Sequence, residues 1–256
     1  MHSGFVDIHS HVLYGMDDGA KSRDGSVKML ELAARSGTTD IVATPHANSK
    51  YRYDRTVIDA QIADLNQAVE GIRVHRGCDF SLQADNIEDA AAHPDKYTIN
   101  GFQYLMVEFP DIPTFGHHDA ILEHLLGAGL IPIITHPERN ASIRRTPNNV
   151  ARWVDFGCYV QVTAGSVTGR FGKGARECID HMLASGHVHF VASDAHDLQD
   201  RPPMLGPAYE ALAAEWGAAN IHPLFVDNPR AVIRGATLDV LPAPPRKPRK
   251  WFQFWK

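Results

Sequence analysis

Acidic and histidine side chains occur at the ends of apolar segments in this chain, in types and spacings that suit metal chemistry. The first such stretch reads FVDIHSHVLYGMDDGAKS. Its Asp7, His9 and His11 alternate with other residues, so in a strand they would share one face. Asp17 and Asp18 follow in a DDG segment. Burying ionisable groups side by side is costly unless a cation compensates them. The stretch therefore favours a metal site.

Further segments carry the same kinds of side chain where a predicted strand ends. In parallel α/β folds functional groups gather at this end of the sheet, because the loops there converge on one rim. Random placement would scatter such residues over helices and over both ends of the strands. Their joint occurrence therefore indicates one site. The candidates are His46 in VATPHA, Asp79 in RGCDF, Glu108 in LMVEFP, His136, Glu138 and Arg139 in IITHPER, and Asp194 and His196 in FVASDAHD.

The donor types restrict the metal. Nitrogen and oxygen donors without a plausible thiolate favour Mn²⁺, Fe²⁺, Zn²⁺ or Mg²⁺ over a structural zinc or an iron–sulfur centre. The candidates exceed the needs of one ion, so we expect two or three. Adjacent metal ions commonly clamp the attacking and leaving oxygens of a phosphoryl displacement. Arg139 and Arg201 would then supply permanently charged donors to phosphate oxygens.

Several other catalytic signatures do not occur in the sequence. A cysteine phosphatase needs C-x₅-R, yet the sixth residue after Cys78, Cys158 and Cys178 is alanine each time. Neither phosphate-binding glycine motif, GxxxxGK[ST] or GxGxxG, is present. The GxSxG nucleophile elbow and HExxH are missing as well. The sequence therefore argues against these mechanisms and leaves the metal chemistry.

The bulk composition is that of an ordinary globular enzyme. The chain has 256 residues, of which 44% are hydrophobic and 21% charged, so it can bury a sizeable core. A net charge of −5 does not suit a nucleic-acid binder. Three cysteines without a CxxC pair indicate a reducing compartment. Neither a signal-peptide pattern nor a membrane-spanning apolar run is visible, so we expect a cytoplasmic protein.

Short apolar runs alternate with amphipathic segments along the chain. This alternation predicts a parallel α/β sheet, closed or nearly closed into a barrel. The predicted strands are Phe5–Ile8, Asp40–Ala43, Val74–Cys78, Tyr104–Val107, Leu130–Ile134, Tyr159–Val162 and His189–Ala192. The predicted helices are Ser26–Arg35, Thr56–Glu70, Asp119–Leu126, Asn148–Asp155, Ala175–Ala184 and Pro207–Trp216.

The character of the sequence changes near its end. We expect one domain over residues 1–240 and a separate tail over residues 241–256, which reads LPAPPRKPRKWFQFWK. The tail is rich in proline, lacks acidic residues and ends in basic and aromatic ones. It is either a solvated extension or a segment that contacts a partner or a membrane surface peripherally. It is too short to span a bilayer.

Five motifs together resemble one known group of enzymes. DIHSHVLYGMDDGAKS, ATPHA, VEFP, THPER and SDAHD…RPP are similar to motifs of the PHP (polymerase and histidinol phosphatase) superfamily. Within it they resemble the bacterial metal-dependent protein-tyrosine phosphatases of capsule and exopolysaccharide operons. The resemblance extends from about residue 5 to DNPRAVIRG at residues 227–235. It implies a distorted seven-stranded (β/α)7 barrel, a trinuclear metal site, with Mn²⁺ as the expected metal, and hydrolysis of protein phosphotyrosine.

The resemblance also implies a role for individual residues. Arg139 and Arg201 match the phosphate-binding arginines. Asp7 and Asp17 resemble residues that support the site without binding metal, either structurally or by orienting the ligand imidazoles. At Asp79 the family usually has a glutamate, so this carboxylate is one methylene shorter than expected. The implied metal ligands are His9, His11, Asp18, His46, Asp79, Glu108, His136, Asp194 and His196.

Three functions remain open at this point. Phosphotyrosine is a favourable substrate because its phenolate leaving group has a pKa near 10 and needs little help from an acid, for which Asp197 is a weak candidate. The same site could instead act on a small phosphate ester such as histidinol phosphate. A third possibility is a regulatory metal-binding module that docks a tyrosine kinase. For the first, the expected partner is a tyrosine-phosphorylated protein, in particular a bacterial tyrosine kinase.

Overall fold

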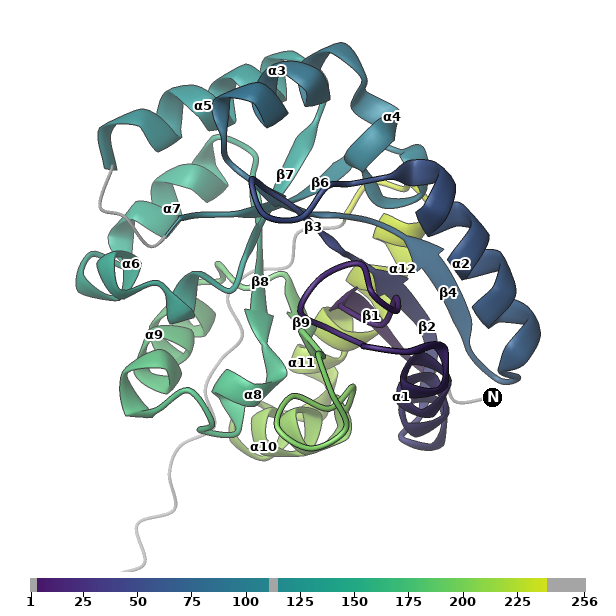
Figure 1. The fold of residues 1–256 in the computed structure, drawn as a ribbon. Helices are drawn as coiled ribbons and strands as arrows, with labels where there is room; N and C mark the ends of the chain where they lie inside the picture. The colour runs from purple at the N-terminus through teal and green to yellow at the C-terminus, as the bar shows by residue number, and fades with distance from the viewer. Residues whose placement is uncertain (1–3, 111–114, 239–256) are drawn as a thin grey trace, which may run out of the picture.

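The computed structural model describes residues 4–110 and 115–238. Their strands are parallel and form two sheets surrounded by helices (Figure 1). The smaller sheet has the order β1-β2-β4 and the larger one β3-β5-β6-β7-β8-β9. The strands are β1 (Phe5–Ser10), β2 (Thr38–Ala43), β3 (His46–Ala47), β4 (Arg73–Arg76), β5 (Asp79–Ser81), β6 (Tyr104–Glu108), β7 (Ile131–Thr135), β8 (Tyr159–Thr163) and β9 (Phe190–Ala192).

The seven predicted strand segments are all present, but the sheet is interrupted. The segment predicted as one strand, Val74–Cys78, divides between β4 and β5, which belong to different sheets. The neighbouring strand is interrupted at Pro45, which lacks the N–H that a continuous ladder would need. At Gly77 a Cβ would lie 2.6 Å from Val42, so only glycine fits at this break. The described residues therefore form nine short strands rather than one closed seven-stranded sheet.

One isolated contact connects the outer strands of the two sheets. Ser10, at the end of β1, forms a parallel bridge with Ala195, which follows β9. His11 N–H donates to the Ala195 carbonyl at 2.8 Å, and Asp194 N–H donates to the His9 carbonyl at 2.9 Å. These bonds bring the carboxyl ends of β1 and β9 together. The first and last strands of the chain therefore contribute to one rim.

Both faces of the larger sheet are buried, as is usual for parallel strands. In β6, Leu105 and Val107 pack in the main apolar cluster, whereas Tyr104 and Met106 pack in a second one. The second cluster also contains Ile8 of β1. Burial of alternate residues on both sides holds the strands in register, so the side chains at their ends are well positioned.

Some of the helices begin at a side chain that accepts hydrogen bonds from the backbone of the first turn. Ser22 accepts from Gly25 N–H at 3.2 Å before α1, and Asp54 accepts from Thr56 N–H at 3.1 Å before α2. The helices are α1 (Arg23–Arg35), α2 (Arg55–Ala68), α3 (Ala84–Ala92), α4 (Pro94–Tyr97), α5 (Phe115–Gly127), α6 (Ala141–Arg145), α7 (Asn148–Asp155), α8 (Ala164–Val167), α9 (Lys173–Ala184), α10 (Gly206–Trp216), α11 (Ala218–Phe225) and α12 (Asp227–Ile233).

The six predicted helices are present, α7 with the predicted ends and the other five with shifted ends, and the other helices were not predicted. Of the unpredicted ones, α11 and α12 pack against β1. In residues 4–110 and 115–238, none of the helices has the length and apolarity needed to cross a bilayer. The predicted tail, residues 241–256, lies outside the described residues.

Candidate metal centre

His9 and His11 meet two carboxylates at the end of β1. The Nε2 atoms of the two histidines lie 3.3 Å apart. His9 Nε2 is 3.5 Å from Asp79 Oδ2 and 3.4 Å from Asp194 Oδ1. His11 Nε2 is also 3.4 Å from Asp194 Oδ1. None of the four residues is more than 1% exposed, so imidazole and carboxylate groups converge here away from water.

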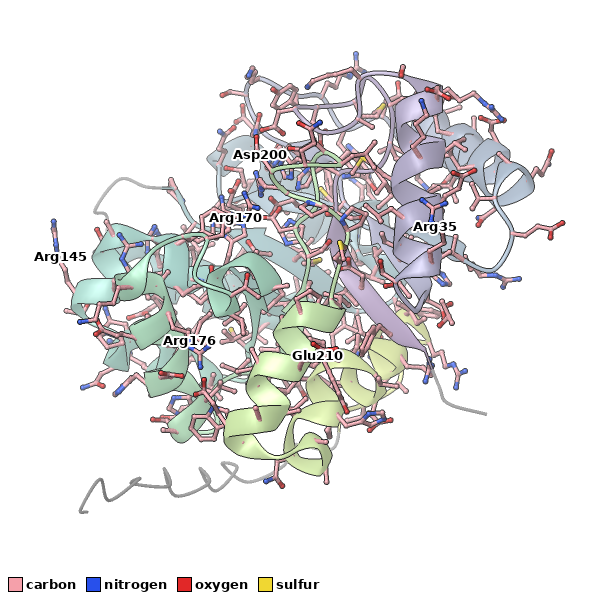
Figure 2. All side chains as sticks on the ribbon, turned by 90° about the horizontal axis from the view of Figure 1, so that it is seen from below. Arg35, Arg145, Arg170, Arg176, Asp200 and Glu210 are labelled. Carbon is pink, nitrogen blue, oxygen red and sulfur yellow. The ribbon has the colours of Figure 1, made fainter. Side chains whose placement is uncertain are left out.

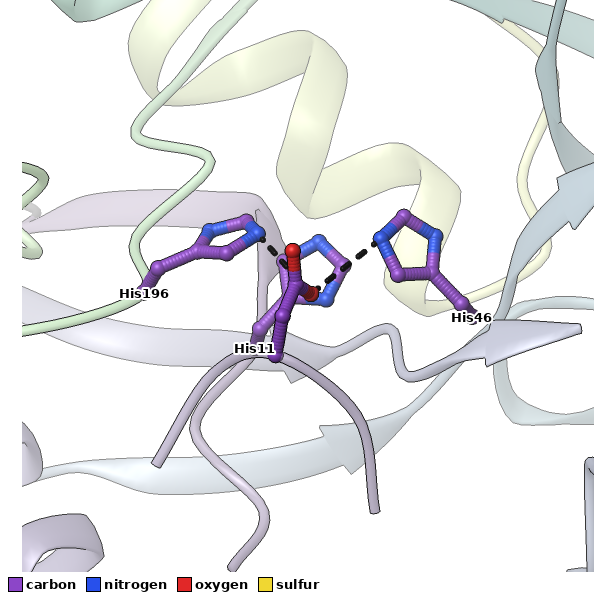
Figure 3. Close-up of side chains that lie close together, drawn as sticks. His11, His46 and His196 are labelled. Atoms are coloured by element: carbon purple, nitrogen blue, oxygen red, sulfur yellow. Dashed lines mark ion pairs between the residues drawn. The ribbon is translucent and has the colours of Figure 1, made fainter. Parts of the chain in front are cut away.

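A second group surrounds the carboxylate of Asp18. Its Oδ1 atom lies 3.4 Å from Nε2 of His46 and 3.4 Å from Nε2 of His196. The ring of His11 lies between these two histidines, with centroid separations of 4.5 and 3.9 Å (Figure 3). The Asp18 side chain is 49% exposed, so this group faces the opening of the site.

A third region contains Glu108 and His136. The Nδ1 atom of His46 lies 3.2 Å from Asp79 Oδ2 and 3.8 Å from Glu108 Oε2. His136 Nε2 is 3.8 Å from Glu108 Oε1, and its ring stacks against that of His9 at 5.5 Å. Residues from β1, β3, β5, β6 and the loops after β7 and β9 thus surround one volume.

Four groups of donors overlap in this volume. Within each group the ligand atoms lie within 4.8 Å of one another, as a bound ion requires. Neighbouring ions would share candidate ligands, because four residues belong to two groups each: His9, His11, His46 and Asp79. The groups are His11, Asp18, His46 and His196; His9, His11 and Asp194; His9, Asp79 and His136; and His46, Asp79 and Glu108.

The hydrogen bonding of Asp79 fits a metal ion. Both carboxylate oxygens are buried and accept no hydrogen bond from the described residues. Burial opposes ionisation of Asp79, but His9 and His46 outweigh it and hold the pKa of this carboxyl well below its usual range. A buried carboxylate stays ionised only where positive charge meets it; here His9 and His46 supply that charge, and a metal ion bound to Asp79 would take their place. The donor set therefore suits one or more divalent cations.

Burial opposes protonation of His9, His11 and His46, but the neighbouring carboxylates outweigh it and raise the pKa of each ring, that of His11 to about 10. The ionisation of Glu108, His136 and His196, by contrast, suits cation binding directly. Burial and the Asp79 charge raise the pKa of Glu108 to about 7. Burial and the nearby Arg139 charge lower the pKa of His136 to about 3, and burial and His11 lower that of His196 to about 3. Neutral imidazole is the form that binds metals. A positive ion among these carboxylates would replace the protons on His9, His11 and His46 as their counter-charge.

Two hydrogen bonds orient His9, which lies in β1, and His11, which follows it. His11 Nδ1 lies 2.7 Å from Asp17 Oδ2, and His9 Nδ1 lies 2.9 Å from Gln161 Oε1. In each ring the opposite nitrogen, Nε2, faces the centre. Such partners fix the tautomer and the orientation of ligating histidines. Gln161 was not predicted, although a polar residue within the apolar run YVQVT was a usable signal.

Asp17 also fixes the DDG segment. Its carboxylate accepts from Gly19 N–H at 2.9 Å and from His46 N–H at 3.1 Å. A Cβ at position 19 would lie only 2.0 Å from the carbonyl oxygen of His11, so the segment needs glycine there. Asp7 belongs to none of the four ligand groups, and its Oδ1 accepts from Ser193 N–H at 3.0 Å. Burial raises the pKa of Asp7 to about 6.

Arg139 and Arg201 meet at the same carboxylate. Both guanidinium groups donate to Oδ2 of Asp194. Glu138 supports the loop that carries Arg139, because its Oε1 accepts from Thr163 N–H at 3.0 Å and from Ser166 Oγ at 2.7 Å. The pair of arginines therefore lies directly beside the candidate ligands.

The backbone is strained at two of these positions. His136 has φ +32° and Asp194 has φ +52°. Left-handed backbone is uncommon outside glycine and tends to occur at functional sites. Asp197, predicted as a weak candidate acid, instead caps its own turn: Oδ1 accepts from Gln199, Asp200 and Arg201 N–H at 2.7, 2.6 and 3.1 Å.

Comparison of the sequence with known protein families identifies the family of this chain. A family model described as capsular polysaccharide synthesis, CpsB/CapC, matches residues 5–234. The chain belongs to the CpsB/CapC family. The tyrosine-protein phosphatase YwqE of Bacillus subtilis is 32% identical over 98% of this chain and 100% of its own length. The tyrosine-protein phosphatase CpsB of Streptococcus pneumoniae is 30% identical over 89% and 98%.

A solved structure agrees with this membership of the CpsB/CapC family, and a more distant one shares the fold. One, from work on YwqE of Bacillus subtilis and CpsB of Streptococcus pneumoniae, describes them as unique metal-dependent tyrosine phosphatases. It has a TM-score of 0.86 and 30% identity, and covers 94% of this chain and 100% of that one. A phosphotriesterase homology protein of Escherichia coli matches with a TM-score of 0.61 over 90% of this chain and 99% of its own, at 10% identity, which shows a shared fold alone.

Proposed function

We propose that this member of the CpsB/CapC family is a metal-dependent phosphatase that hydrolyses phosphotyrosine in proteins. The observation that carries the proposal is the overlap of four ligand groups beside two arginines that share Asp194. Its relatives YwqE and CpsB are named tyrosine-protein phosphatases. The three cysteines are buried and belong to none of the four ligand groups, which argues against a cysteine nucleophile.

We assign the metal ligands as the sequence predicted them. Two or three ions fit the number of donors, and Mn²⁺ suits a nitrogen and oxygen set, with Fe, Zn or Mg as other candidates. Asp7 supports the end of β1, and Asp17 orients His11. The proposed ligands are His9, His11, Asp18, His46, Asp79, Glu108, His136, Asp194 and His196.

The residues of the chain bind and orient the phosphate. When bound, the metal ions would supply Lewis-acid activation of water and neutralise charge on the phosphoryl oxygens. Arg139 and Arg201 donate to one carboxylate oxygen, so both can reach an anion at that position. Their planar, permanently charged donors suit phosphate oxygens in the ground and transition states. Asp197 accepts three backbone bonds, which argues against it as the acid; a phenolate can leave without one.

The wider setting of the protein is also a proposal. We take the two sheets as an interrupted form of a distorted (β/α)7 barrel within a single domain over residues 1–240. A bacterial tyrosine kinase of a capsule or exopolysaccharide system is the proposed partner, because the family concerns capsular polysaccharide synthesis. Three unpaired cysteines favour the cytoplasm. The basic and aromatic tail, residues 241–256, is proposed to contact the membrane or the kinase.

The deciding experiment measures phosphate release from a tyrosine-phosphorylated peptide by metal-stripped protein, with and without added Mn²⁺. Histidinol phosphate serves as the small-ester comparison. We expect release only with metal, and faster release from the peptide. His136→Ala should abolish release in protein that keeps its circular dichroism spectrum. Faster hydrolysis of histidinol phosphate would instead favour the small-ester function, and no release from either substrate would favour a regulatory module.

A further inference from the structure

A small cavity of about 200 Å³ lies beside the two arginines. Most of its lining residues come from α8 with the turn that follows it and from the segment that leads into α10. In Figure 1, α8 and α10 lie side by side. Its walls are mainly apolar, and Ala164 and Ala208 are almost fully buried. A concave apolar surface with a few polar groups is the usual form of a binding pocket. The apolar residues of the wall include Ala164, Gly165, Phe171, Pro202, Met204 and Ala208.

This cavity adjoins the two arginines that lie beside the candidate metal centre. Arg201 lines it and also donates to Asp194. Phe171 lines it as well, and its ring contacts the guanidinium group of Arg139. An anion held by the two arginines would therefore lie directly beside the mouth of the cavity. Anything attached to that anion could reach the cavity without a change in the fold.

A second cavity, of about 280 Å³, has a different relation to the centre. Glu108, His136 and Arg139 are among its lining residues, so it opens onto the candidate ligands themselves. The reacting phosphate and its aryl group would occupy this side. The smaller cavity contains none of the candidate ligands. It is therefore available for a part of the substrate that does not react.

We propose that the smaller cavity binds the apolar side chain of a residue directly next to phosphotyrosine in the substrate protein. This inference rests on the proposed function and assigns a sequence preference to it. A medium-sized aliphatic side chain would bury its surface against Phe171, Pro202 and Met204. Burial of apolar area is favourable and non-directional, so shape and size decide the preference.

The rim of the cavity is consistent with this occupant. Arg170 Nη1 and Asp200 Oδ1 lie 3.7 Å apart, and their side chains are 43% and 89% exposed. Figure 2 shows the two residues close together. The charges of Arg170 and Asp200 are opposite and offset each other, and the third charged residue of the lining, Arg201, is paired with Asp194. An apolar centre within a polar rim is also the usual layout of a protein interface.

Peptides that differ only beside phosphotyrosine test the inference. Leucine, glycine or aspartate would be placed at the position before or after phosphotyrosine, and kcat/KM measured with Mn²⁺ present. p-Nitrophenyl phosphate, which has no flanking residue, reports the chemistry alone. We expect at least one leucine peptide to exceed its glycine and aspartate counterparts about tenfold, which corresponds to ~1.4 kcal/mol. Equal values for all peptides would overturn the inference.

Two variants test whether the smaller cavity causes the preference for leucine beside phosphotyrosine. Met204→Trp fills the cavity and should lower the ratio of kcat/KM for the leucine peptide to that for the glycine peptide to about one. Both values are measured on the same variant, so a change in its basal rate does not affect the ratio. Val57→Ala truncates an apolar residue on α2 that is 41% exposed and outside the cavity, and should keep the tenfold ratio. A ratio unchanged by Met204→Trp would place the preference elsewhere. If wild type hydrolyses p-nitrophenyl phosphate but no phosphotyrosine peptide, the proposed function fails as well.

Discussion

The guanidinium carbon of Arg139 lies 4.6 Å from the centroid of the Phe171 ring. A cation over an aromatic face is attracted to it, and the flat ring restricts the planes that the guanidinium can adopt. Gly165 makes room for this ring, because a Cβ there would lie 3.1 Å from Phe171. The contact therefore holds a candidate phosphate-binding group before any substrate arrives.

Phe171→Leu should weaken phosphate binding without loss of metal. Removing the ring contact costs about 1 kcal/mol, so we expect the inhibition constant of inorganic phosphate to rise roughly fivefold. Metal content measured by mass spectrometry should not change. Phe171→Tyr, which keeps an aromatic face, should restore most of the affinity. Phe156→Leu is the matched control, because Phe156 makes a similar contact with Arg152, at 5.4 Å, outside the site; an equal effect there would contradict the assignment.

Asp17→Asn should lower the affinity for metal. Asp17 orients His11 through a bond of 2.7 Å and accepts from two backbone N–H groups. Loss of such a partner to a ligating histidine usually reduces metal affinity or activity by about 10- to 100-fold. Competition with a chelating dye would measure the affinity directly. Asp24→Asn, at a side chain that is 73% exposed on α1, is the control and should bind metal like wild type.

Alkylation of thiols should leave the enzyme active, whereas chelation should not. Burial raises the pKa of Cys158 to about 12 and that of Cys178 to about 11, and it raises the pKa of Cys78 well above its usual range. These thiols are therefore protonated and inaccessible at neutral pH. We expect most of the activity to survive iodoacetamide and to disappear with EDTA. Rapid inactivation by iodoacetamide with one equivalent bound would point to a cysteine mechanism.

Asp89→Asn should destabilise the protein at neutral pH but not in strong acid. Lys96 Nζ and Tyr97 Oη both lie 2.5 Å from Asp89 Oδ2, and they lower the pKa of Asp89 to about 2 from its ordinary 3.8. Because the folded pKa is the lower one, ionisation of Asp89 stabilises the fold above pH 3.8. This contribution is lost as pH falls toward 2.

The expected size of this effect is about 1 kcal/mol after screening by solvent, because the Asp89 side chain is 31% exposed. Urea unfolding of wild type and Asp89→Asn at pH 7 and at pH 3 would measure it. The difference in unfolding free energy should shrink at the lower pH. A difference that stays constant or grows as pH falls would show that the carboxylate is not the source of the stability.

The composition of the centre could be anticipated from the sequence because parallel strands all end at one rim. His46, Glu108 and Asp194 lie far apart in the chain, yet each follows a predicted strand. The structure brings these residues and the six other candidate ligands into four overlapping groups. Their role as ligands stays a prediction. The strand ends could be found because the alternation of apolar residues within a strand, and the order of strands and helices, are local properties of the sequence.

The breaks in the sheet could not be read from the sequence in the same way. Val74–Cys78 has the pattern of one strand, and its division depends on Gly77 packing against Val42 of a neighbouring strand. Helices α11 and α12 have weak local signals and are held by contacts with β1. Such features depend on close approach between segments that are distant in sequence, and no local pattern records that approach.

By itself, the sequence determined which kinds of chemistry this protein can perform, because residue type and strand-end position select nitrogen and oxygen donors over thiols. Only the tertiary structure decided how they are used. It directs Arg139 and Arg201 to one oxygen of Asp194, lays Phe171 beside Arg139 and leaves a cavity behind them. Side-chain direction and empty volume result from packing among many segments, so they are properties of the assembled fold and not of any stretch of sequence.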